Sequence, residues 1–375
     1  MPPAYEKLAQ YLDRLPAGYP PAENGVELLL LQELFSEEEA ELALHLTLLY
    51  EEPRVIAYRA RLPVEQVAQM LVEMENKGLI SANHSSRKPT TYSISQFVVG
   101  FWEGQVNRLR TEVVRLFEAY APVWFEKGSW RRTPQLRTIP VGEAIPITSE
   151  VMPYDQIEQI LRSKHSIAVR NCVCRQERDL VGEGCGKPLE TCLSFDGGAL
   201  NTERSGNGRL ISLDEALQIV DQAKQAGLVL QPANSQNPIF VCMCCSCCCG
   251  ILRHLKQEPD PGSLVANAYI ASHDEDLCVN CGECAMICPM EALTFGDDGF
   301  IQFQAPRCIG CGLCVSVCPN EAVQIIHRPV AEVAATPKNT LHTYYNLAKA
   351  GGRWHSLEMV GMVVRSYVDR MLAPK

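Results

Sequence analysis

The chain has 375 residues and a formal net charge of −10, from 34 lysines and arginines against 44 aspartates and glutamates. This length exceeds what one hydrophobic core supports, so two to three domains are expected. No apolar run approaches the length of a membrane helix, and the first fifteen residues lack the apolar core of a signal peptide, which predicts a cytoplasmic protein without a membrane span.

Eighteen cysteines are the unusual feature of the composition. The chain is too long for the class of small secreted proteins that are held together by disulfides. In a reducing cytoplasm, free thiols in this number would be prone to oxidation. Most of the cysteines are therefore expected to hold metal.

The first part of the chain predicts three helices followed by a β-hairpin. Residues 1–25 form an N-terminal extension, and residues 26–98 form the first domain. Ser36 and Glu39 have the spacing of a capping box, which starts a helix. The helices are expected at 36–50, 54–60 and 63–78, and the hairpin at 79–94. This order resembles a winged helix-turn-helix domain.

The charge of this winged-helix-like domain is unfavourable for DNA binding. Residues 26–98 contain eleven glutamates and six arginines and lysines, a net charge of −5. Phosphate binding depends on cationic side chains, so a scaffold or dimerisation role is favoured over DNA recognition. DNA binding stays open as the lesser alternative, because several cations could gather on one face (Arg54, Arg59, Arg61, Arg87 and Lys88).

Residues 99–140 are expected to link this domain to the next. The segment from Phe97 to Phe125 is predicted to be largely helical, with one apolar side. Lys127 to Pro140 is basic and contains two prolines, so it is predicted to be an exposed loop.

The middle domain, residues 141–256, is predicted to be a small α/β unit that binds metal. Two apolar strands each deliver a group of cysteines: 167–169 leads into Cys172 and Cys174, and 239–241 leads into the second group. A capped helix over 212–226 lies between them. The candidate ligands are ten cysteines, of which the sequence does not select a subset: Cys172, Cys174, Cys185, Cys192, Cys242, Cys244, Cys245, Cys247, Cys248 and Cys249.

Three interpretations of these ten cysteines stay open. They could hold one or two further iron–sulfur clusters, a structural zinc ion, or a redox-active thiol site with or without an unusual cluster. If the two strands share a sheet, their ends lie side by side. We therefore expect Cys172, Cys174, Cys242 and Cys245 to meet at one metal site.

Residues 272–330 contain an internal repeat of cysteines. The pattern Cys-x2-Cys-x2-Cys-x3-Cys-Pro begins at Cys278 and again thirty residues later, at Cys308. Three thiolates at this spacing hold one iron–sulfur cube, and the fourth reaches the neighbouring cube. We therefore assign Cys278, Cys281, Cys284 and Cys318 to the first [4Fe-4S] cluster. The second [4Fe-4S] cluster is assigned to Cys308, Cys311, Cys314 and Cys288.

The repeat resembles the bacterial two-[4Fe-4S] ferredoxin family over about sixty residues. The whole chain resembles multidomain 4Fe-4S dicluster proteins of anaerobic bacteria. The ferredoxin segment has eight acidic residues against Arg307 and Arg328, so a redox partner with a basic docking surface is expected. Residues 336–375 are predicted to form a helical tail, two helices around Gly351, with Leu357, Val360, Val364, Val368 and Leu372 packed against the body.

The sequence thus predicts an α+β multidomain protein that transfers electrons through iron–sulfur clusters. One alternative is a redox-sensing transcription regulator that acts through the winged helix. Another is an oxidoreductase with its active site at the middle cysteines, although an electron carrier or an oxidoreductase subunit is favoured over a stand-alone enzyme. The sequence names no electron donor, electron acceptor or oligomeric state.

Overall fold

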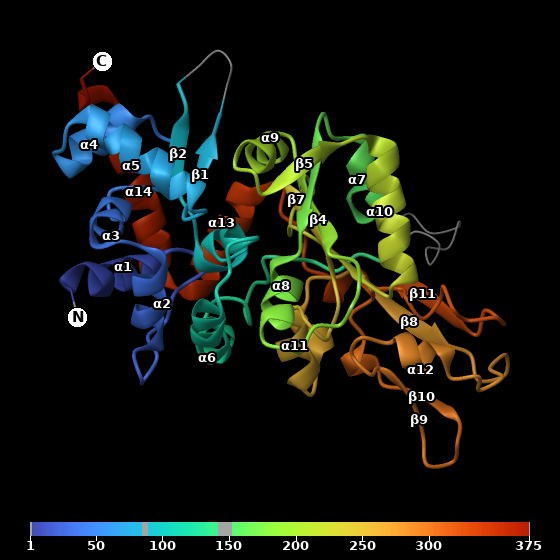
Figure 1. Cartoon of the computed structure of the whole chain (residues 1–375). Coiled ribbons are helices and arrows are strands. Elements are labelled where there is room, and N and C mark those ends of the chain that lie inside the picture. Colours follow the sequence, from blue (N-terminus) through green and yellow to red (C-terminus); the bar gives the residue numbers. More distant parts are fainter. Residues whose placement is uncertain (1, 85–88, 142–151, 375) are drawn as a thin grey trace.

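The structure is a computed structural model that describes residues 2–84, 89–141 and 152–374. It is a mixed α+β structure with small sheets, as predicted. Figure 1 shows the N-terminal helices at one end, the five-stranded sheet in the middle, and the short strand pairs of the cysteine repeat at the other end.

The N-terminal part has five helices and one hairpin among the described residues. Ser36 and Glu39 form the predicted capping box, with the Ser36 hydroxyl accepting from the Glu39 amide. The helix that it starts ends at Ala43, earlier than predicted, because the chain turns to pair Glu51 with Tyr92 of the hairpin. The elements are α1 (Pro3–Arg14), α2 (Val26–Leu34), α3 (Glu37–Ala43), α4 (Pro53–Ala60), α5 (Val64–Asn76), β1 (Ile80–Asn83) and β2 (Thr91–Ile94).

The linker is less helical than predicted. Residues 97–105 form short irregular turns, and a regular helix, α6 (Thr111–Lys127), begins only later. Packing explains the difference. The Gly104 backbone lies so close to Gly78 that a Cβ at Gly78 would stand 2.2 Å from the Gly104 carbonyl oxygen. The turn also stacks Trp102 on Phe117 of α6, with 3.7 Å between ring centroids.

The middle sheet is antiparallel, in the order β5-β3-β4-β7-β6. Strands β3 and β7 run in the same direction with β4 between them, so the end of β3, the start of β4 and the end of β7 lie at one edge. The strands are β3 (Ile167–Asn171), β4 (Glu190–Phe195), β5 (Gly208–Ile211), β6 (Val229–Pro232) and β7 (Phe240–Cys244). The helices are α7 (Ile157–Arg162), α8 (Val173–Leu180), α9 (Gly197–Arg204), α10 (Leu213–Gln225) and α11 (Gly250–Gln257).

Two strand pairs carry the cysteine repeat. Strand β8 (Tyr269–His273) pairs with β11 (Val323–His327), and β9 (Leu293–Phe295) pairs with β10 (Ile301–Phe303). The chain turns between β9 and β10 at Gly299, which has φ +79°. A short helix, α12 (Glu283–Ile287), follows the first two cysteines and contains the third, Cys284.

The C-terminal tail forms the two predicted helices, α13 (Thr340–Gly351) and α14 (Arg353–Leu372). The predicted packing face is wrong. Its members Leu357, Val360, Val364, Val368 and Leu372 are 42–60% exposed, whereas Met362 and Ser366 are buried. An ion pair between Asp369 of α14 and buried Arg59 of α4 fixes which side of the helix faces the body.

Within the described parts of the chain, none of the helices combines the length and apolar character needed to cross a membrane.

Candidate metal centres

The eight cysteines of the repeat lie in two groups of four. The first ferredoxin group, Cys278, Cys281, Cys284 and Cys318, lines one small cavity. The second ferredoxin group, Cys288, Cys308, Cys311 and Cys314, lines another. In each group, three cysteines come from one copy of the repeat and the fourth from the other copy. Ligation of iron by these groups stays a prediction, and their positions suit it.

The surroundings of both ferredoxin groups suit sulfur that is bound to metal. Backbone amides donate to sulfur at three cysteines: Asn280 to Cys278 (3.4 Å), Ala292 to Cys288 (3.2 Å) and Ala271 to Cys308 (3.4 Å). Burial raises the pKa of the thiols of Cys284, Cys308 and Cys314. Amide–sulfur hydrogen bonds and burial are the features by which proteins set the reduction potential of an iron–sulfur cluster.

Two glycines allow the close turns of these groups. Gly310 has φ +69°, and a Cβ there would stand 2.3 Å from the Tyr269 carbonyl oxygen. Gly282 has φ +82°, and a Cβ there would stand 2.6 Å from the Phe295 ring. Both positions therefore need a residue without a side chain.

The ten cysteines of the middle domain divide into two further groups. The six-cysteine group consists of Cys172, Cys174, Cys192, Cys242, Cys244 and Cys249, which line one cavity. The four-cysteine group consists of Cys185, Cys245, Cys247 and Cys248, whose sulfurs all lie within 4.8 Å of one another. All ten are free thiols in this structure.

The sheet edge builds the six-cysteine group. Cys192 of β4 lies directly opposite Cys242 of β7 and opposite Arg170 of β3. Cys172 caps the N-terminus of α8, and Cys249 caps the N-terminus of α11. Because alternate residues of a strand share a face, Cys244 joins Cys242 on the same side of β7.

Thiols of the six-cysteine group interact in a continuous series, from Cys172 through Cys174, Cys249, Cys244 and Cys242 to Cys192. Hydrogen bonds from neighbouring thiols lower the pKa of three of them. The pKa of Cys192 falls to about 5, through the hydrogen bond from Cys242 and, further, the charge of Arg170. The pKa of Cys172 and that of Cys249 also fall. The donating thiols, Cys174, Cys242 and Cys244, have raised pKa values. The three thiols with a lowered pKa are thus separated from one another by thiols that donate to them.

Two arginines oppose this negative charge. The Arg170 guanidinium donates to the Cys192 sulfur at 3.3 Å. Arg175 is 2% exposed and donates to the carbonyls of Met243 and Pro188, both at 2.8 Å. Its charge acts on Cys172 and Cys244 of the six-cysteine group and on Cys245 of the four-cysteine group. Arg175 therefore interacts with both groups.

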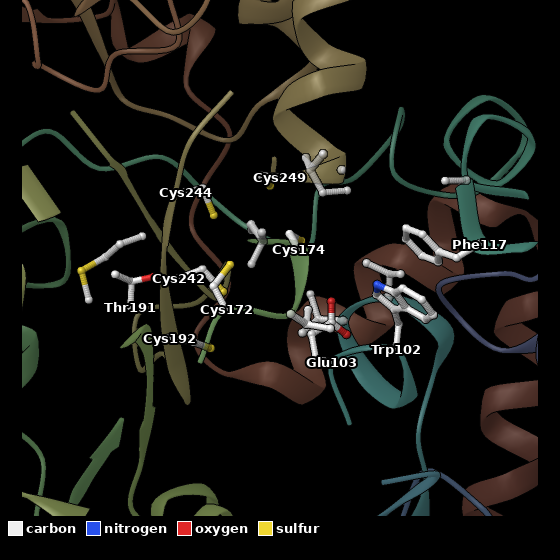
Figure 2. Close-up of a pocket in the computed structure, with 18 of the residues that line it drawn as sticks. Trp102, Glu103, Phe117, Cys172, Cys174, Thr191, Cys192, Cys242, Cys244 and Cys249 are labelled. Carbon is white, nitrogen blue, oxygen red and sulfur yellow. The ribbon is translucent and has the colours of Figure 1, made fainter. Parts of the chain in front are cut away.

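The cavity at the six-cysteine group has a volume of about 70 Å³. Figure 2 shows the cysteines on one side and Trp102 and Phe117 on the other, with Glu103 between them. Burial raises the pKa of the Glu103 carboxyl to about 7, although the Gly100 amide donates to it at 2.6 Å. The cavity thus combines thiols, one carboxyl group and apolar walls.

The four-cysteine group comes from two loops. Cys185 lies between α8 and β4, and the other three lie in the turn between β7 and α11. The Cys185 and Cys245 sulfurs are 3.9 Å apart, and the Cys247 and Cys248 sulfurs are 4.0 Å apart. A tetrahedral ion with metal–sulfur bonds of about 2.3 Å would separate its sulfurs by about 3.8 Å. The four-cysteine group therefore fits a single ion.

The structure divides the four cysteines that we expected at one site. Cys172, Cys174 and Cys242 lie at the cavity, whereas Cys245 lies in the four-cysteine group. Strand alternation explains this difference, because the residue after Cys244 points away from the cavity. Cys185 and Cys192, which the sequence left unplaced, fall into different groups. The apolar wall of the cavity, from Trp102 and Phe117, comes from the linker and carried no signal in the sequence.

Helix α11 connects the cavity with the cysteine repeat. It begins after Cys249, and at its other end the Arg307 guanidinium donates to the carbonyls of Lys256 (2.9 Å) and Glu258 (3.0 Å). Arg307 precedes Cys308 of the second ferredoxin group. Eight helical residues span about 12 Å. The six-cysteine group and the residue that precedes Cys308 thus contact opposite ends of this helix.

Comparison with known protein families gives one match. The family model described as a 4Fe-4S dicluster domain matches residues 271–325. Neither the search of curated proteins nor the search of solved structures found a match. The match supports an iron–sulfur protein with a ferredoxin-like segment, and it covers the cysteine repeat and not the six-cysteine or four-cysteine group.

Proposed function

We propose that this protein transfers single electrons through two [4Fe-4S] clusters, one on each ferredoxin group. The observation that carries the proposal is the crosswise arrangement of the eight cysteines within the segment that matches the dicluster domain. Each group offers four thiols, the number that one cubane uses. In the ferredoxin segment, acidic residues outnumber Arg307 and Arg328, so the donor or acceptor would present a basic surface.

The proposal places the middle domain at the far end of the electron path. Arg307, the neighbour of Cys308, contacts one end of α11, and Cys249 of the six-cysteine group precedes the other end. Electron transfer between protein-bound centres weakens steeply with distance, so a connection through one short helix would favour direct transfer. The four-cysteine group would hold a single zinc or iron ion that fixes two loops of the domain.

An oxidoreductase reaction at the cavity is a second candidate. The cavity of about 70 Å³ beside the six-cysteine group supports it, because a reaction centre needs space for a substrate. The volume and apolar walls would admit only a small molecule, and this candidate requires that no cluster fills the space. Carbon monoxide is a suitable probe: a change in the electron paramagnetic resonance of a reduced centre would support this candidate, and an unchanged spectrum would count against it.

The winged-helix regulator is not favoured. Arg59, one of the cations expected on a DNA-binding face, is buried in an ion pair with Glu51 at 2.7 Å. Arg54 donates to the Ala373 carbonyl at the end of the chain's last helix. Arg87 and Lys88 lie outside the described residues. We propose that this part is a cytoplasmic scaffold or dimerisation module.

A matched set of variants tests the two clusters. Cys318→Ala and Cys281→Ala should each remove the cluster of the first ferredoxin group and leave the same residual spectrum. Cys288→Ala and Cys308→Ala should each remove the cluster of the second ferredoxin group and leave the spectrum of the first cluster. Electron paramagnetic resonance of the reduced, anaerobically purified chain distinguishes these outcomes. If the Cys318→Ala spectrum matched that of Cys308→Ala, the crosswise arrangement would be wrong.

A further inference from the structure

The six-cysteine group offers more ligands than one metal ion or one ordinary cubane uses. Its thiols interact in one continuous series around a single cavity. None of the six is in a disulfide. A tetrahedral ion binds four thiolates, and a [4Fe-4S] cubane likewise takes four. Six adjacent thiols around one space therefore suit a larger centre that contains several metal ions.

The surroundings favour a centre with net negative charge. Arg170 donates to the Cys192 sulfur at 3.3 Å, and Arg175 is buried between the six-cysteine and four-cysteine groups. Helices α8 and α11 both begin at cysteines of the group, with their N-termini at the cavity. A helix N-terminus carries partial positive charge, and buried arginines need anions close by. These four sources of positive charge lie close to thiols of the six-cysteine group.

The other wall of the cavity is apolar and rigid. Trp102 is stacked on Phe117, and both are buried. Val98 and Ile251 also line the space. Such walls exclude water and lower the local dielectric constant, which strengthens the attraction between a negative centre and the arginines. Among the other lining residues only Glu103 and His254 could also bind metal, so the six thiols supply most of the potential ligands.

We propose that the six-cysteine group holds one polynuclear iron–sulfide cluster, larger than the clusters of the cysteine repeat and bound by its six thiolates. The choice of iron and sulfide rests on the proposed function, because the two ferredoxin clusters imply a supply of both. The cluster lies at the end of α11, where it exchanges electrons with the second ferredoxin group. The four-cysteine group is a separate site for a single ion.

Iron and acid-labile sulfide counts on the full chain, purified anaerobically, test this inference. The wild-type chain should exceed the eight iron and eight sulfide of two [4Fe-4S] clusters by more than the four of each that a third cubane would add. Cys172→Ser and Cys242→Ser, on different strands, should each lose most of this excess iron and sulfide together. Cys185→Ser in the four-cysteine group is the matched control and should keep the excess sulfide. An excess of four sulfides or fewer, or excess metal with no matching sulfide, would overturn the proposal.

A second pair of variants separates this inference from the proposed function. A chain with Cys281→Ala and Cys308→Ala lacks a ligand in both ferredoxin groups, so the sulfide that it retains belongs to the six-cysteine group. Iron and sulfide retained in that chain support the larger cluster even if the ferredoxin clusters prove absent. A complete loss of sulfide in that chain, with a normal circular dichroism spectrum, would count against it.

Arg170→Met tests the cluster without changing any of its proposed cysteine ligands. Removal of a positive charge beside a negative cluster should lower its reduction potential, while the iron and sulfide counts stay at the wild-type values. The potentials of the two ferredoxin clusters should not change, and they serve as an internal control. An unchanged potential of the additional centre would contradict its placement beside Cys192.

Discussion

Cys247→Ser tests the single-ion site most simply, because Cys247 is the exposed member of the four-cysteine group. The sulfur separations of 3.9 and 4.0 Å in this group are close to the value of about 3.8 Å for one tetrahedral ion. Structural zinc sites bind with apparent free energies of about 10–16 kcal/mol. Shared among four ligands, this gives about 3 kcal/mol for each, so Cys247→Ser should weaken binding about a hundredfold.

The assay is competition between the protein and a zinc chelator, with the metal content of the wild-type chain measured first. Zinc or iron in that measurement identifies the resident ion. Ser246→Ala is the matched control, because Ser246 lies in the same turn and is not in the four-cysteine group. Equal affinity in Cys247→Ser and the wild type would refute the reasoning. So would an equal loss of affinity in Ser246→Ala.

Three further predictions concern other parts of the fold. Arg59→Met leaves the buried Glu51 carboxylate unpaired and should lower the free energy of unfolding by about 3–5 kcal/mol in urea denaturation. Lys7→Met, at an exposed ion pair, should lower it by less than about 1 kcal/mol, and equal losses would contradict this prediction. Gly310→Ala should lower the iron content of the chain, because its Cβ would meet the Tyr269 carbonyl. Gly299→Ala, with open space around its Cβ, should keep the iron, and equal iron contents in the two variants would contradict this prediction. The full chain should show no specific DNA binding at physiological salt in gel-shift titrations, and a salt-sensitive nanomolar shift with a promoter fragment would contradict this.

Local signals in the sequence predicted much of the secondary structure. The capping residues Ser36 and Ser212 accept the predicted hydrogen bonds from Glu39 and Glu215. Gly227 follows helix α10 with φ +66°, as expected after a helix C-terminus. These features depend on residues three or four positions apart, so a single sequence carries them.

Tertiary contacts decided the features that the sequence did not predict. The linker leaves the helical path because Gly104 packs against Gly78, which lies twenty-six positions earlier. Helix α14 exposes its apolar side because Asp369 pairs with Arg59. Neither partner can be identified from the local pattern.

The candidate metal centres show the same contrast between local sequence signals and tertiary contacts. Within each copy of the repeat, regular spacing indicated three cysteines that belong together, and the ligand pattern assigned the fourth from the other copy. The middle cysteines follow the pairing of three strands, which places Cys192 opposite Cys242 although fifty residues separate them. Adjacent residues such as Cys244 and Cys245 fall into different groups, because successive residues along a strand point to opposite faces.

A redox titration of the full chain, followed by electron paramagnetic resonance, tests the central claim of electron transfer most directly. We expect the signals of two reduced [4Fe-4S] clusters, each appearing with the uptake of one electron, and both should survive Cys185→Ser in the four-cysteine group. A fully metal-loaded chain that shows no reducible [4Fe-4S] signal, or only one, would contradict the account.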